Sequence, residues 1–173
     1  NEKIIKDETT NKWFTGLEFG EDVNDLKKTL IDLHIGLGDV VLVCLPNTAA
    51  YPVLTQALWE VGAIMHPISA TTPERELQQE LSDHDYVASI VGENLVNAVL
   101  DERMAIVTAL HLQTYSILHI IRDRKLMGHE AALPKEDDLA LILNTSGTTG
   151  KPKRVGLTHR ILKNAAEHDI ESH

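Results

Sequence analysis

Short, continuous apolar runs recur along the chain and predict buried β-strands. They lie at residues 40–45, 63–68, 86–91, 116–121 and 139–143. Continuous rather than alternating apolarity is typical of a strand that is covered on both faces, as in a parallel sheet. We therefore expect a mostly parallel sheet flanked by helices.

Helical signals fill the segments between these runs. Apolar residues spaced three or four positions apart indicate one face of a first helix: Val23, Leu26, Leu30 and Leu33. Residues 49–61 predict a second helix, which Gly62 ends. A third is expected to begin with Thr72 as its cap and Pro73 in the first helical position, and residues 95–112 predict a fourth. Strands that alternate with helices predict βαβ units and an α/β fold.

The pattern divides the chain into three parts. Residues 1–37 hold an N-terminal segment and the first helix, and residues 38–138 form an α/β subdomain. Residues 139–173 supply a strand, a loop and the start of another helix. Segment 122–138 is polar and poorly periodic, and it contains a glycine and a proline, which indicates a linker or a surface excursion.

The composition excludes several classes of protein. Of 173 residues, 43% are apolar and 24% are charged, which is typical of a globular chain rather than a disordered one. The net charge of −10 disfavours binding to nucleic acid or to an anionic membrane. No apolar stretch approaches the roughly 18 residues that cross a bilayer. With no signal-peptide pattern at the N-terminus, we expect a cytoplasmic protein without a membrane span.

Cysteine and histidine usage suggests no metal site. Cys44 lies inside an apolar run, where a buried and unreactive thiol is expected. The nine histidines show no H-E-x-x-H spacing and have no cysteine partners. His66 and His119 are interpreted as core histidines whose ring nitrogens are satisfied by hydrogen bonds, while His159 and Trp59 are assigned structural and packing roles.

Positive charge is concentrated near the C-terminal end. Residues 144–166 contain no acid, although the chain as a whole is acidic. The cations in this stretch are Lys151, Lys153, Arg154, Arg160 and Lys163. Positive charges without a negative one indicate a local site for an anion.

The basic stretch begins with small, flexible and hydroxyl-bearing residues directly after a buried strand. The run is Thr145-Ser146-Gly147-Thr148-Thr149-Gly150-Lys151-Pro152-Lys153. Glycines let the backbone approach a ligand, and successive N–H groups form a concavity for anions. Hydroxyls add donors and lysine adds a mobile charge. The run therefore predicts a phosphate-binding loop rather than a plain surface turn.

A Walker A loop does not account for this run. That motif requires glycine where Thr145 stands, and serine or threonine where Pro152 follows Lys151. Pro152 also makes Lys151 a poor helix residue.

The run resembles the signature loop of the adenylate-forming superfamily, which includes acyl-CoA synthetases, luciferases and peptide-synthetase adenylation domains. Residues 38–47 resemble its "GDRVALLLPN" strand, and residues 57–64 its "LAALRAGAV" helix and strand. Residues 72–77 resemble "TPEEL", and residues 157–160 are similar to the segment after the loop. The chain thus looks like part of the large N-terminal domain. The resemblance implies that the magnesium-binding acid, the ribose-binding aspartate and the mobile domain with its catalytic lysine lie beyond His173.

The resemblance implies a two-step reaction on a small-molecule carboxylate. The carboxylate attacks the α-phosphorus of ATP to give an acyl-adenylate, and a thiol, usually coenzyme A, then displaces AMP. ATP, Mg²⁺ and coenzyme A are the implied cofactors, the last two held largely by missing parts. No catalytic residue is assigned to this chain. The residues carried over as phosphate contacts are Thr145, Ser146, Gly147, Thr148, Thr149, Gly150, Lys151 and Lys153.

Three functions remain open at this point. An acyl-CoA synthetase of fatty acid metabolism is favoured, because Thr148-Thr149 leans towards coenzyme A ligases. The alternatives are an adenylation domain of the peptide-synthetase type and a non-catalytic fragment that binds a nucleotide or an acyl group.

Arg154 stands where the family usually has glycine. Because an arginine is strained at positive φ, we expect Arg154 in extended backbone, opening a strand that reaches Leu157. That strand should pair with residues 139–143 as a hairpin whose connection is the loop. The guanidinium should then point to solvent or reach a phosphate.

Overall fold

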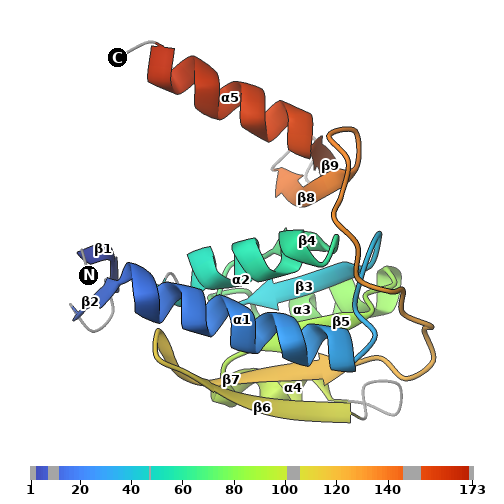
Figure 1. Ribbon diagram of the computed structural model, residues 1–173. Coiled ribbons are helices and arrows are strands. Elements are labelled where there is room, and N and C mark those ends of the chain that lie inside the picture. The colour runs from blue at the N-terminus through green and yellow to red at the C-terminus, as the bar shows by residue number, and fades with distance from the viewer. Residues whose placement is uncertain (1–2, 8–11, 47, 101–105, 146–152, 172–173) are drawn as a thin grey trace.

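The computed structural model describes residues 3–7, 12–46, 48–100, 106–145 and 153–171 (Figure 1). The first half of these ranges holds β1 (Lys3–Asp7), β2 (Lys12–Thr15), α1 (Gly16–Asp32), β3 (Val40–Cys44), α2 (Ala50–Glu60), β4 (Ile64–Pro67) and α3 (Glu74–Asp83). The second half holds β5 (Ala88–Val91), the 3₁₀ turn η1 (Glu93–Leu95), α4 (Val96–Val99), β6 (Ile106–Leu112), β7 (Tyr115–Arg122), β8 (Leu139–Thr145), β9 (Lys153–Thr158) and α5 (His159–Glu171). None of the helices so described is both long enough and apolar enough to cross a membrane.

A mixed sheet forms the centre of the described structure. Its strand order is β6-β7-β5-β3-β4-β8-β9, and the inner strands β5, β3, β4 and β8 run parallel. The hairpins β6–β7 and β8–β9 continue the sheet antiparallel on either side. The sequence-based expectation of an α/β fold with a mostly parallel sheet is confirmed.

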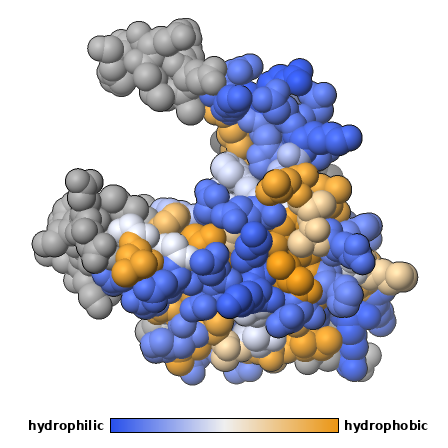
Figure 2. Space-filling view, in the orientation of Figure 1, coloured by the Kyte–Doolittle hydropathy of each residue, from blue (hydrophilic) through white to orange (hydrophobic). Residues whose placement is uncertain are grey.

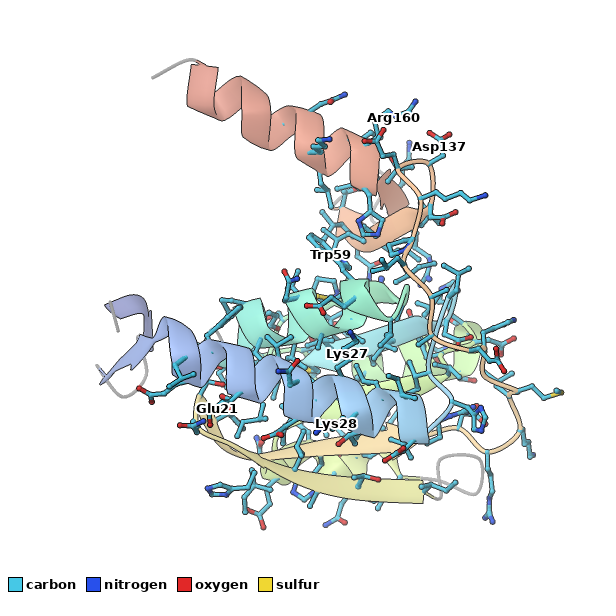
Figure 3. The ribbon with its side chains drawn as sticks, in the orientation of Figure 1. Glu21, Lys27, Lys28, Trp59, Asp137 and Arg160 are labelled. Atoms are coloured by element: carbon cyan, nitrogen blue, oxygen red, sulfur yellow. The ribbon has the colours of Figure 1, made fainter. Side chains whose placement is uncertain are left out.

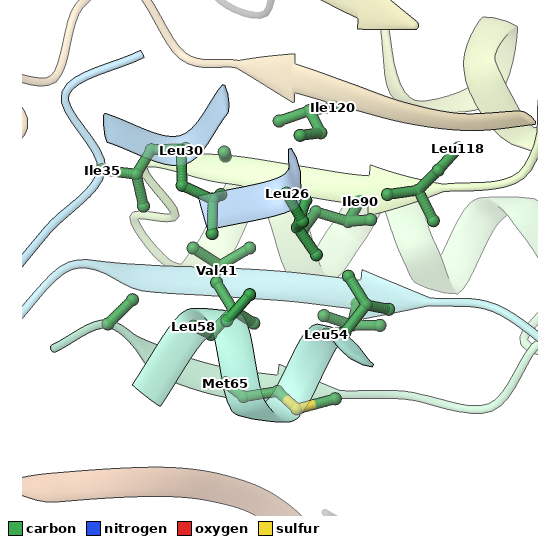
Figure 4. Close-up of a cluster of buried hydrophobic side chains, with 14 of the residues drawn as sticks. Leu26, Leu30, Ile35, Val41, Leu54, Leu58, Met65, Ile90, Leu118 and Ile120 are labelled. Atoms are coloured by element: carbon green, nitrogen blue, oxygen red, sulfur yellow. The ribbon is translucent and has the colours of Figure 1, made fainter. Parts of the chain in front are cut away.

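Helices cover both faces of β3, β4 and β5, whereas β8 is more exposed than its apolar run predicted, with Ala140 as its one buried residue. Alternate residues of β3 point to opposite faces: Val41 and Val43 join the cluster under α1 and α2, and Leu42 and Cys44 join the one under α3 and α4. Figure 4 shows the first cluster, in which Leu26 of α1 approaches the sheet. Burial on both sides explains why these strands read as unbroken apolar runs.

The helix expected at residues 95–112 is wrong. Among the described residues of this range, only those of η1 and α4 are helical, and β6 forms an antiparallel strand with β7. Ile106, Val107 and Thr108 open β6, and branched side chains of this type favour strands. Pairing with β7 decides the outcome, and that long-range partner is invisible in a local pattern.

The expectation that run 116–121 is a parallel strand needs a smaller correction. β7 does form, but it pairs antiparallel with both β5 and β6. A buried strand has the same apolar pattern in either direction, so the run does not reveal the orientation.

The expected cap of α3 is also wrong. The Thr72 hydroxyl donates to the Ser69 carbonyl oxygen at 2.6 Å, so it is used in the preceding turn. Pro73 takes the N-cap position in extended backbone, and its carbonyl oxygen accepts a bond from the Leu77 N–H at 3.0 Å.

Segment 123–138 returns the chain from β7 to β8 without regular structure, as expected of a surface excursion. Leu37 N–H donates to the Glu130 carbonyl oxygen, and Ala132 N–H donates to that of Val61. The segment passes so close to Gly36 that a Cβ there would lie 2.3 Å from the Glu130 oxygen. The side of the molecule along which it runs carries apolar side chains (Figure 2). The path delivers the chain to the start of β8.

Candidate functional site

The β8–β9 hairpin carries the predicted phosphate-binding run. Asn144 pairs with Arg154 across the two strands, and Thr145 pairs with Lys153 at their ends. The Thr145 hydroxyl donates to the Lys153 carbonyl oxygen at 3.3 Å. Residues 146–152 therefore connect the two strand ends, and the predicted hairpin is confirmed.

The structure describes only the two ends of the predicted site. Thr145 and Lys153 lie side by side at the tip of the hairpin, and both are exposed. Within the described ranges, Lys153 takes part in no salt bridge, so its ammonium group is available to an anion. The other expected contacts lie outside the described residues and stay predictions: Ser146, Gly147, Thr148, Thr149, Gly150 and Lys151.

The hairpin tip lies at the carboxyl edge of the parallel strands. β4 and β8 run parallel through the pair Met65 and Leu141, so their carboxyl ends, Pro67 and Thr145, share one edge. Ligands of open α/β sheets bind outside the carboxyl ends of the strands. The predicted loop therefore begins where this class of fold binds its ligands.

A cavity of about 930 Å³ opens beside the hairpin tip. Asn144 and Arg154 line it from the hairpin, and α3 lines it with acids that include Glu76, Glu80 and Asp83. The remaining lining residues are Pro67, Ile68, Ser69, Thr72, Gln79 and His84. Because carboxylates repel phosphate, a nucleotide phosphate fits the hairpin end of this cavity better than its α3 side.

From the sequence we expected the Arg154 guanidinium to point to solvent or to reach a phosphate. In the structure it instead binds other side chains of the protein. Its Nη1 donates to Glu80 Oε1 and to the Tyr86 hydroxyl oxygen, each at 2.8 Å. The Tyr86 hydroxyl in turn donates to Glu80 Oε1 at 2.5 Å. Arg154 is in β9 without positive φ, as expected, but α3 holds its guanidinium.

His66 extends this cluster into the core. Its side chain is fully buried, and Nε2 lies 3.3 Å from Glu80 Oε1 without the geometry of a hydrogen bond. Burial, reinforced by the Arg154 charge and partly opposed by Glu80, lowers the pKa of His66 to about 4. Burial and the bond to Glu80 raise the pKa of Tyr86, so its hydroxyl stays a donor. His66 is buried in the core, as the apolar run predicted, but the expectation that its ring would be satisfied there is wrong, because neither ring nitrogen has a hydrogen-bond partner.

The sequence interpretation missed Glu80 and Tyr86 as partners of Arg154. Glu80 lies beside the buried residues Leu77 and Leu81 of α3, which is a weak signal that it borders the core. Tyr86 opens a buried run, and a buried phenol needs a hydrogen-bond partner. Nothing local indicates that the partner comes from 68 residues away.

The base of the hairpin is held by a different set of side chains. Trp59 lies between α2 and the hairpin, and the edge of its ring meets His159 with centroids 5.3 Å apart (Figure 3). Arg160 pairs with Glu136 and Asp137 at the start of α5. The packing and structural roles expected of Trp59 and His159 are confirmed.

Curated relatives of the chain fall in two groups of enzymes. It is 36% identical over 126 residues to 4-coumarate–CoA ligase-like 5 of Oryza sativa subsp. japonica, covering 72% of this chain and 23% of that protein. It is 25% identical over 158 residues to a plipastatin synthase polypeptide of Bacillus subtilis, covering 91% of this chain and 6% of that protein. The chain thus spans less than a quarter of the length of either relative.

Solved structures and family comparison agree with this picture. The N-terminal subdomain of NpsA from Klebsiella oxytoca, in complex with 3-hydroxyanthranilyl-AMSN, is similar with a TM-score of 0.60 and 28% identity. That match covers 87% of this chain and 35% of the other. The AMP-binding enzyme family matches residues 2–172. The chain therefore belongs to the AMP-binding enzyme family of adenylate-forming ligases, with the fold of their N-terminal domain.

Proposed function

We propose that this chain supplies the nucleotide-phosphate site of an ATP-dependent acid–thiol ligase, most simply an acyl-CoA synthetase. The observation that carries the proposal is the β8–β9 hairpin, which places Thr145 and Lys153, the two ends of run 145–153, at the carboxyl edge beside a cavity. In this family that edge serves a reaction on ATP. The three-part division of the chain, with residues 139–173 as the phosphate-binding part, belongs to the same proposal.

The proposed reaction has two transfers. A carboxylate oxygen attacks the α-phosphorus of ATP, the bond from that phosphorus to the β-phosphate bridge breaks, and pyrophosphate leaves. A thiol sulfur then attacks the acyl carbon, and AMP leaves with the bonding electrons. The contribution of this chain is to hold the β- and γ-phosphates, with Lys151 and Lys153 offsetting charge that grows on the leaving pyrophosphate.

The proposal assigns no bound metal or coenzyme A to residues of this chain. The part of the chain that the structure describes brings no three His, Cys, Asp or Glu side chains together around a metal position. In this proposal the family resemblance, and not that observation, assigns Mg²⁺ and coenzyme A largely to segments outside this chain.

A second candidate differs in the thiol acceptor. The plipastatin synthase polypeptide and NpsA are among the similar proteins, which favours an adenylation domain whose acceptor is a carrier protein rather than coenzyme A. Both candidates require the same adenylation step. A fragment that only binds nucleotide would share the phosphate contacts and lack the second transfer.

Nucleotide binding by the 173-residue chain tests the phosphate assignment. Titration calorimetry with ATP and with AMP separates the β- and γ-phosphates from the rest of the nucleotide. Lys151→Ala should weaken ATP binding about tenfold, because one charge-assisted contact is lost, and should leave AMP binding unchanged. Lys125→Ala removes an exposed lysine away from the hairpin and is the matched control. Equal effects of Lys151→Ala on ATP and AMP would contradict the assignment.

Ligase activity is tested separately. The 173-residue chain alone should release no pyrophosphate with ATP, Mg²⁺ and mixed carboxylates, because the resemblance places the catalytic lysine beyond His173. A longer polypeptide that contains this chain should show carboxylate-dependent ATP–pyrophosphate exchange, and a panel of acids would identify its substrate. Thioester formation with free coenzyme A or only with a carrier protein then separates the two enzyme candidates. Acid-dependent pyrophosphate release by the short chain would refute the first expectation.

A further inference from the structure

The β8–β9 hairpin is joined to the fold at its base and again near its tip. At the base, β8 meets β4 at the pair Met65 and Leu141. Near the tip, the ladder leads into residues 146–152, and Arg154 is the residue there that reaches another element. Its position matters because it lies next to Lys153 and opposite Asn144, so holding Arg154 holds both strands where they enter the loop.

The Arg154 side chain is held by an ion pair with Glu80 and by a cation–π contact with Tyr86. The side chains of Arg154 and Glu80 are 29% and 19% exposed, so water screens their ion pair only in part. The guanidinium also lies over the Tyr86 ring, with Cζ 5.7 Å from the ring centroid. Tyr86 is fully buried, and α3 is fixed in the core by Leu77. The partners of Arg154 are thus parts of the rigid core.

Of the two described cations at the hairpin tip, Arg154 and Lys153, these contacts leave Lys153 able to meet a ligand. Arg154 uses two short bonds on Glu80 and Tyr86, whereas Lys153 is exposed and takes part in no salt bridge within the described ranges. Neighbouring cations on one strand therefore have different surroundings, one facing α3 and one facing solvent.

We propose that Arg154 is a positioning residue, which latches the β8–β9 hairpin to Glu80 of α3 and to Tyr86 before β5 and so holds the strand ends Thr145 and Lys153 beside the cavity. The identity of the loop as a phosphate site rests on the function proposed above. The latch itself rests only on the contacts of Arg154. It implies that breaking the latch loosens β9 while leaving the inner strands as they are.

Amide hydrogen exchange on the full chain tests the latch without any ligand. Arg154→Met should speed exchange of the β9 amides, such as those of Val155 and Leu157, by roughly tenfold relative to β3. Glu80→Gln should have a smaller effect in the same direction, and the double variant should match Arg154→Met because both remove one contact. Arg154→Lys should recover part of the protection. Lys27→Met, which breaks the Lys27–Glu60 ion pair between α1 and α2, is the matched control and should leave β9 unchanged.

ATP affinity separates a latch from a direct phosphate contact. A latch predicts that Arg154→Met and Glu80→Gln both weaken ATP binding, even though the second removes a negative charge from the cavity wall. A direct contact predicts that Arg154→Met weakens binding while Glu80→Gln leaves it unchanged or strengthens it, and this result would overturn the latch. Unchanged β9 exchange in Arg154→Met, or faster exchange throughout the chain, would overturn it as well. If the wild-type chain binds no ATP, the proposed function fails, and the exchange experiment still decides the latch.

Discussion

Trp59 on α2 donates its indole N–H to the carbonyl oxygen of Ala140 on β8, with 3.0 Å between the nitrogen and the oxygen. Ala140 is fully buried and directly precedes Leu141, the residue through which β8 joins β4. The bond therefore satisfies a buried carbonyl and fixes the point where the β8–β9 hairpin joins the rest of the sheet.

Replacing this indole should loosen the base of the hairpin. Trp59→Phe keeps an aromatic ring but leaves the Ala140 carbonyl without its donor, which should cost about 1–3 kcal/mol in the free energy of unfolding. Urea titration followed by circular dichroism gives the value. Gln56→Ala, an exposed change on the same helix, should stay within about 0.5 kcal/mol of wild type. A Trp59→Phe chain as stable as the control would show that the bond contributes nothing.

Asp22 is a second long-range anchor, and its removal should be costly. The buried carboxylate accepts bonds from Gln113 N–H at 3.0 Å, Thr114 N–H at 2.8 Å and the Thr114 hydroxyl at 2.7 Å. Asp22→Ala leaves these donors unpaired at the β6–β7 turn and should destabilise the fold by about 3 kcal/mol or more. Asp25→Ala changes an exposed acid of the same helix and is the control. Equal unfolding midpoints for the two variants would count against this role.

Gly36 should tolerate no side chain. A Cβ there would meet the Glu130 carbonyl oxygen at 2.3 Å and the His129 oxygen at 2.4 Å, so backbone would have to move. We expect Gly36→Ala to lower stability by roughly 2 kcal/mol or more. Gly20→Ala is the control with the opposite expectation, because Gly20 lies within α1 and a Cβ added there would meet nothing within 4 Å. It should stabilise by about 0.5–1 kcal/mol. Thermal melts of both variants would reveal the sign of each effect.

The inner strands were predictable because their signal is local and strong. Val41 to Val43 are buried on both sides, and burial on both sides requires an unbroken apolar run. β6 escaped prediction because six of its seven residues are partly or fully exposed and its strand character depends on pairing with β7. The hydrophobic pattern of a segment therefore predicts how deeply the segment is buried better than it predicts which strand the segment pairs with.

For the candidate site, too, the sequence predicted the local structure but not the long-range contacts. The position of the hairpin followed from the run after a buried strand and from the strain that an arginine would suffer at positive φ. The hydrogen-bond partner of the Arg154 side chain could not be predicted from the sequence, because Glu80 lies 74 residues away along the chain. From the sequence alone, an arginine next to a phosphate-binding run suggests a phosphate contact. Only the structure shows that the Glu80 carboxylate and the Tyr86 hydroxyl lie within hydrogen-bond distance of Arg154.

His66 gives the cluster around Glu80 a defined pH dependence. Burial lowers its pKa to about 4 in the folded chain, while an unfolded histidine titrates near pH 6.5. Between these values the unfolded chain binds a proton that the folded chain does not, so acid favours unfolding. The contribution of His66 is therefore complete above about pH 6.5 and is lost as the pH falls towards 4.

The loss can be measured by comparison with a side chain that does not titrate. The stability of wild type should fall by up to about 1.4 kcal/mol per pH unit more steeply than that of His66→Gln between pH 6 and 4.5. Urea titrations at several pH values give both slopes, and other acids cancel because they are common to the two chains. His66→Leu checks that the slope reflects the charge rather than the amide, because it should follow His66→Gln although its absolute stability differs. Parallel curves for wild type and both variants would contradict this prediction, because they would mean that His66 becomes protonated in the folded chain without cost.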